Sequence, residues 1–100
     1  MKAGRWRRLI RMTTLKPRPA GLLVKEIDGE VLVLDTGSDQ IHQLNEAASV
    51  VWRGVAAGSS VSQIVQILVS QFDVTEDIAV QDVEGALVRF EALNLLAKEM

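Results

Sequence analysis

The chain has 100 residues, of which 48% are hydrophobic, and a formal net charge of −2. This composition predicts a single domain with one core, and the absence of cysteine excludes disulfides, thiolate metal sites and cysteine nucleophiles, which fits a cytoplasmic location. Its apolar runs are far shorter than the roughly 20 residues of a membrane-spanning helix, so no membrane partner is expected.

Charge is distributed unevenly along the chain. Residues 1–19 contain seven basic residues and no acidic residue, so the rest of the chain contains four basic and 13 acidic residues and carries a net charge of −9. We expect residues 1–16 to form a flexible basic tail and residues 17–100 to form the folded domain. Translation from Met12 is the alternative, and it removes most of this tail.

Two strands joined by a tight turn follow an extended lead-in. The lead-in, residues 13–21, contains both prolines and no regular apolar period, so it is interpreted as a linker. Residues 22–27 and 30–34 are rich in aliphatic residues and are predicted to be strands. Asp28 and Gly29 separate them, and this pair favours a type I′ hairpin turn, in which both central residues have positive φ.

A third strand is predicted over residues 40–44, after a polar loop in which Gly37 is free to adopt positive φ. Three strands joined by short loops form an antiparallel meander in sequence order, which makes the third strand an edge. The middle strand has aliphatic residues on both faces, more than one layer of helices can cover. We expect the lead-in, another subunit or a ligand to cover the second face.

Three later segments carry apolar residues at helical spacing. Asn45 is a suitable N-cap for a first helix that ends near Gly58. Ser60 and Gln63 form a capping box before a second helix, and Thr75 caps a third. The apolar stripes of the three helices, in order, are Ala48, Val51, Trp52 and Val55; Val61, Ile64, Val65, Leu68 and Phe72; and Val83, Ala86, Leu87 and Phe90.

The third helix contains Gly85, which costs about 1 kcal/mol relative to alanine in a helix interior. We therefore expect a neighbouring backbone to pass close to it, either a packed element or a bound peptide. Asn94 can end this helix in the left-handed region, and residues 95–99 form a short strand or a docked tail. The predicted fold class is α+β, a three-stranded antiparallel β-meander followed by three α-helices.

No group of residues has the pattern of a catalytic or cofactor site. Asp82 and Glu84 diverge, because helix residues two apart do not face each other, and Glu76 and Asp77 suit the positive end of a helix dipole. His42 has no serine or carboxylate motif nearby, so it is interpreted as structural and not as a general base or pH switch. We expect no enzyme activity, no cofactor and no metal.

In their order and spacing, several short segments resemble the PqqD-like family, also called RiPP recognition elements. The matching segments are residues 28–35, the loop ending at 39, and residues 42–45, 47–48, 51–52, 61–64, 72–74, 81–83 and 93–96. The resemblance covers about residues 17–97, nearly the whole predicted domain. The chain departs from the family pattern at residues 55–58, which have no acidic residue before the glycine, and at Asn94, where the family commonly has glycine.

The resemblance implies a winged-helix-like, non-catalytic domain that binds the leader segment of a ribosomally synthesised precursor peptide. Such a domain presents the peptide to a modifying enzyme, often a radical SAM protein. The peptide is expected to add to the third strand and to lie beside the third helix. The residues implied are Gln40, Ile41, His42, Gln43 and Leu44 as the docking edge, Val83, Ala86, Leu87 and Phe90 as the groove floor insofar as the core does not consume them, and Asp82 and Arg89 as its rim.

Two other functions are compatible with the pattern. A winged-helix DNA-binding domain would use the basic tail as an arm, but nucleic acid is disfavoured because the second helix has no basic residue and the acidic domain repels phosphate. A dimerisation module would pair two third strands across a twofold axis, and a peptide could displace that contact. We favour a peptide-binding chaperone, because an edge strand supplies unpaired main-chain groups.

Overall fold

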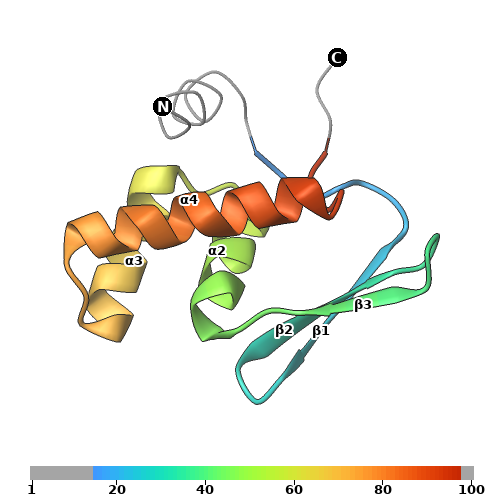
Figure 1. The fold of residues 1–100 in the computed structure, drawn as a ribbon, viewed down its shortest axis with the longest axis horizontal. Helices are drawn as coiled ribbons and strands as arrows, with labels where there is room; N and C mark the ends of the chain where they lie inside the picture. Colours follow the sequence, from blue (N-terminus) through green and yellow to red (C-terminus); the bar gives the residue numbers. More distant parts are fainter. Residues whose placement is uncertain (1–14, 98–100) are drawn as a thin grey trace.

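The computed structural model describes residues 15–97, so the predicted basic tail lies almost entirely outside the described residues. Strands β1 (Leu22–Ile27), β2 (Glu30–Asp35) and β3 (Gln40–Gln43) precede helices α2 (Glu46–Ala57), α3 (Val61–Phe72) and α4 (Glu76–Ala92). Helix α4 lies across α2 and α3, and the sheet extends to one side of this helical layer (Figure 1). The predicted α+β fold, a β-meander followed by three helices, is confirmed.

The sheet is antiparallel in the order β1-β2-β3, as predicted. Asp28 and Gly29 have φ values of 52° and 82°, the positive values that a type I′ turn requires. In the β2–β3 loop, positive φ occurs at Asp39, with 59°, and not at Gly37. The Gly37 N–H instead donates to the Asp35 carboxylate over 3.0 Å, and aspartate is among the few residues that tolerate the left-handed region.

Each helix begins at the cap that the sequence predicts. The Asn45 side chain accepts a backbone N–H from the first turn of α2, which ends at Gly58 with a φ of 78°. Ser60 and Gln63 form both bonds of the capping box of α3. Thr75 accepts a backbone N–H from the first turn of α4. Local hydrogen bonding therefore fixes the start of each of the three helices within residues 15–97.

The core lies between the helices and the inner face of the sheet, which is the face turned toward them. Val31 and Val33 of β2 are fully buried there. Trp52 of α2 and Phe90 of α4 meet edge to face, with their ring centroids 5.4 Å apart, and this contact joins the two helices. Three members of the predicted stripes are only partly buried: Val61, Phe72 and Ala86.

The glycines inside the helices correct one prediction. The packed element expected beside Gly85 is not found among the described residues, because Gly85 is exposed and a Cβ there would meet no atom within 4 Å, whereas the bound-peptide alternative stays a prediction. The close approach lies instead at Gly54, where a Cβ would clash with the Ile64 side chain. Ile64 is itself buried. Because Gly54 has no side chain, the Ile64 side chain of α3 can pack directly against the backbone of α2.

The lead-in, which the sequence predicts to be a linker, is bonded to the segment that follows α4. The Arg18 N–H donates to the Leu95 carbonyl over 2.9 Å, and Pro17 and Leu96 form a single antiparallel bridge. Asn94, with a φ of 62°, turns the chain after α4 as predicted. The beginning and the end of the described chain therefore hold each other beside α4 (Figure 1).

Candidate functional site

Strand β3 forms one edge of the sheet, and no strand among residues 15–97 lies beyond it. The Leu44 N–H donates to the Val31 carbonyl over 2.9 Å. Because antiparallel bonding alternates along a strand, His42 also directs its main-chain groups toward β2, whereas Ile41 and Gln43 direct theirs away from the sheet. The free edge thus offers the N–H and C=O groups of these two residues to an added strand.

One end of β3 is fixed by Ser49, a fully buried residue of α2. Its hydroxyl accepts the Val31 N–H over 2.8 Å and donates to the Leu44 carbonyl over 3.2 Å. The second bond of the Val31–Leu44 pair therefore passes through a side chain, and the ladder opens where β3 leads into α2. The buried hydroxyl is satisfied as both donor and acceptor.

The other end of β3 is held through Asp35, which pairs with Gln40 across the strands. The Arg18 guanidinium donates to both Asp35 carboxylate oxygens, over 3.1 and 3.3 Å, and this hydrogen bonding lowers the pKa of Asp35 to about 2. Arg18 also donates to the carbonyls of Gly21 and Asn94, each over 3.1 Å. One side chain thus joins the lead-in, β2 and the end of α4 beside the start of β3.

The side chains of the predicted docking edge are divided between the two faces of the sheet. Gln40 and His42 pair with inner-face residues of β2, and His42 is half-buried. Ile41 and Gln43 lie on the outer face, which is the face turned away from the helices, and both are exposed. Leu44 follows the strand and is fully buried in the core. The contact of these residues with a peptide stays a prediction.

The predicted groove residues of α4 differ in their accessibility. Three of them are core residues with no exposed surface: Val83, Leu87 and Phe90. Ala86 is partly buried, and Asp82 and Arg89 are exposed. These three follow one another at helical spacing on one flank of α4. In the free chain, this flank is the part of the predicted groove that a partner can reach.

Three residues that shape this edge are missed by sequence reasoning: Arg18, Asp35 and Ser49. A signal exists for Asp35, because it follows Val31 and Val33 at the same alternation and so falls on the buried face of β2. Ser49 lies among apolar positions of α2 without belonging to the stripe, and Arg18 belongs to a segment without a period. The roles of Ser49 and Arg18 are therefore visible only in their tertiary contacts.

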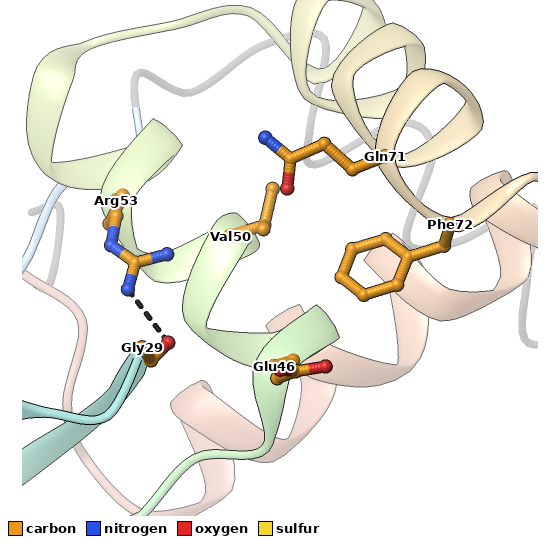
Figure 2. Close-up of a pocket in the computed structure, with 6 residues that line it drawn as sticks. All are labelled: Gly29, Glu46, Val50, Arg53, Gln71 and Phe72. Carbon is orange, nitrogen blue, oxygen red and sulfur yellow. Dashed lines mark hydrogen bonds between the residues drawn. The ribbon is translucent and has the colours of Figure 1, made fainter.

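A separate hollow of about 360 Å³ lies between the β1–β2 turn, α2 and α3 (Figure 2). Its lining residues are Gly29, Glu46, Val50, Arg53, Gln71 and Phe72. The Arg53 guanidinium donates to the Gly29 carbonyl over 2.9 Å and to both carboxylate oxygens of Glu26, over 2.9 and 3.1 Å. This pairing lowers the pKa of Glu26 and raises that of Arg53. Arg53 therefore already bonds to other residues of the domain, and these contacts hold its guanidinium at the hollow.

Other kinds of site find little support in the part of the chain that the structure describes. No group of three or more His, Cys, Asp or Glu residues there could hold a metal ion. No helix within residues 15–97 has the length and apolar character required to cross a membrane. The main chain of β3, held at one end by the buried Ser49 contacts and at the other through the part-buried Arg18–Asp35 pair, is therefore the candidate site.

Comparison with known proteins places this geometry in a family. The model of the PqqD family, described as coenzyme PQQ synthesis protein D, matches residues 30–96, whereas a search of curated proteins finds no match.

Two solved structures share the fold. One, lasso peptide synthetase B1 complexed with the leader peptide, has a TM-score of 0.77 and 22% identity over 86% of this chain and 100% of that chain. The other, TbiB1 in complex with the TbiA(beta) leader peptide, has a TM-score of 0.75 and 20% identity over 85% of this chain and 98% of that chain. Because the family match spans well over half of the residues, the chain belongs to the PqqD family.

Proposed function

We propose that this protein binds the leader segment of a ribosomally synthesised precursor peptide by strand addition to β3. The observation that carries the proposal is the free edge of β3, at which Ile41 and Gln43 direct their main-chain groups away from the sheet. Family membership and the leader-peptide complexes formed by the two structures of the same fold support it. In this proposal the protein acts in the cytoplasm, uses no cofactor and catalyses no reaction.

Side chains of an added strand alternate between the two faces of the sheet. Those on the inner face would lie near Gln40 and His42 and toward α4, where Asp82, Ala86 and Arg89 offer an acid, a small apolar surface and a base. Main-chain bonds supply affinity that is independent of sequence, and these side chains select among peptides. A modifying enzyme then receives the captured peptide, and the family resemblance favours an enzyme of the radical SAM class.

The alternatives have less support. Helix α3 contains no lysine or arginine, and residues 15–97 contain five basic and twelve acidic residues, for a net charge of −7. A DNA-reading helix needs the opposite charge. A homodimer formed by pairing two β3 edges would use the same main-chain groups as the peptide, so the two interactions exclude each other.

Strand addition is tested by titrating isotope-labelled protein with the leader peptide encoded next to this gene. Binding is expected to shift the amide resonances of Ile41 and Gln43 most strongly. Peptides methylated on one backbone nitrogen at a time supply the control, because methylation weakens binding at the residues whose N–H bonds to β3 and has no effect at the residues between them. Shifts confined to other parts of the domain, or an absence of this alternation, would exclude strand addition.

A further inference from the structure

The outer face of the sheet carries a continuous apolar row across all three strands. Leu23 of β1, Leu34 of β2 and Ile41 of β3 are direct cross-strand partners, and these three residues define the row. Leu23 is 54% exposed, and Ile41, at 66%, is the most exposed large apolar side chain of the described residues. Because its members are contiguous and two of them are this exposed, the row is a candidate contact surface.

Nothing within residues 15–97 covers the row. The lead-in, which the sequence makes one candidate for this role, passes elsewhere: Pro17 pairs with Leu96, and the Gly21 carbonyl accepts the Thr36 N–H over 2.9 Å. The helices pack on the inner face, where Val31 and Val33 are fully buried.

The register of β3 connects the apolar row to the free edge. Its outward main-chain groups belong to Ile41 and Gln43, and the side chains of the same two residues lie on the outer face. A peptide residue bonded to the main chain of Ile41 therefore also places its side chain on the outer face, about 5.5 Å away between Cα atoms. Main-chain capture and side-chain contact with the row thus fall on one peptide residue.

We propose that the captured peptide has an aliphatic or aromatic residue at the position paired with Ile41, and that this residue extends the apolar row onto a fourth strand. The proposal rests on the proposed function and adds the outer face of the sheet to the surfaces that select the peptide. The peptide residue that pairs with Gln43 is two positions away from the one that pairs with Ile41. It lies beside a polar pair, because the Gln43 side chain donates to Glu30 over 2.8 Å. That position accepts polar residues.

The test begins with a displayed library of random twelve-residue peptides, selected on the full-length protein, followed by synthetic peptides labelled with a fluorophore. Methylation of single backbone nitrogens identifies the peptide residues bonded to Ile41 and Gln43, and NMR cross-peaks between the peptide and the Ile41 side chain distinguish the partner of Ile41. We expect an aliphatic or aromatic residue there, and its replacement by serine to weaken binding about fivefold, the range of a good cross-strand pair.

Protein variants provide the matched control. Ile41→Thr keeps the β-branched shape and removes the apolar end of the side chain, so it is expected to weaken peptide binding about fivefold. Ile41→Val keeps an apolar side chain and is expected to retain peptide binding. Ile27 lies on the same outer face at the opposite edge and is 55% exposed. Ile27→Thr is therefore expected to leave peptide binding unchanged. Thermal unfolding checks that all three variants are folded.

The outcomes separate the two proposals. Peptides that pair with β3 but tolerate serine beside Ile41 overturn the further inference and leave strand addition in place. Equal losses for Ile27→Thr and Ile41→Thr also overturn it, because the row would then act as a general apolar surface. A library that yields no peptide with an alternating methylation pattern overturns the proposed function itself.

Discussion

The hydroxyl of Ser49 takes the place of a peptide group in the β2–β3 ladder. A regular antiparallel pair of Val31 and Leu44 would exchange two main-chain bonds. One of these bonds is present, and the other is relayed through Ser49 Oγ, which contacts both residues. The last residue of the docking edge is thereby attached to α2, and the strand can end without leaving a buried N–H unpaired.

Ser49→Ala is expected to lower the free energy of unfolding by about 1–3 kcal/mol, because it leaves a buried N–H and a buried carbonyl without their partner. Chemical denaturation followed by circular dichroism measures this loss. Ser70→Ala, at an exposed position of α3, is the control and is expected to stay within about 0.5 kcal/mol of the parent protein. An unchanged stability for Ser49→Ala would mean that the two backbone groups can bond directly.

Asp35 makes stability depend on pH in a defined direction. Its pKa of about 2 in the folded chain lies below the ordinary value of 3.8, because the Arg18 guanidinium donates to the carboxylate. Its contribution to stability is therefore fully present above about pH 5 and is lost as the pH falls through about 2. Denaturation between these limits is expected to show a shallower loss for Asp35→Asn than for the parent. Asp39→Asn, which changes an exposed acid of the β2–β3 loop, is the control, and an equally shallow loss there would contradict this assignment.

Among the elements, the two helical glycines have opposite roles. Replacing either by alanine gains about 1 kcal/mol of helix propensity. At Gly85 nothing opposes this gain, so Gly85→Ala is expected to stabilise the protein by about 0.5–1 kcal/mol. At Gly54 the new Cβ would meet the buried Ile64 side chain, and overpacking costs about 1–3 kcal/mol. Thermal unfolding should therefore move in opposite directions for the two variants, and a lower Tm for Gly85→Ala would show that its backbone has an unseen constraint.

Prediction from sequence succeeds for the elements where the cause is local. The Asp28-Gly29 turn and the caps at Asn45 and Thr75 depend on residues close in the chain, and all are found as predicted. The packed neighbour predicted at Gly85 is not found, and the position of Gly85 off the apolar stripe of α4 already indicates its exposure. Gly54 lies three residues after Val51, on the buried side of α2. The helical period of the apolar residues therefore indicates that Gly54 faces a packed neighbour.

At the scale of the whole molecule, the candidate site depends on contacts between distant segments. Arg18 joins the lead-in to Asp35 and to the Asn94 carbonyl, and no local pattern announces a contact between residues so far apart in sequence. The order of the strands, the free edge of β3 and the apolar character of both faces of β2 follow from alternation and loop length. The accessibility of the α4 side chains does not follow from alternation and loop length. Helix packing determines it, and this packing buries Val83 and Leu87 and leaves Ala86 only partly buried.

Charge is also separated over the whole molecule, since residues 15–97 carry −7 whereas the preceding residues are basic. Any binding to duplex DNA is therefore expected to depend on the tail, with log affinity falling against log salt by about 0.9 for each phosphate contact. Replacing four arginines of the full-length chain with glutamine should abolish this binding and leave peptide affinity unchanged: Arg5, Arg7, Arg8 and Arg11. Fluorescence anisotropy with a labelled duplex and with the leader peptide, across a range of salt concentrations, measures both. Duplex binding that keeps its steep salt dependence in this variant would show that residues other than these four arginines make the contact, and would favour the nucleic-acid alternative.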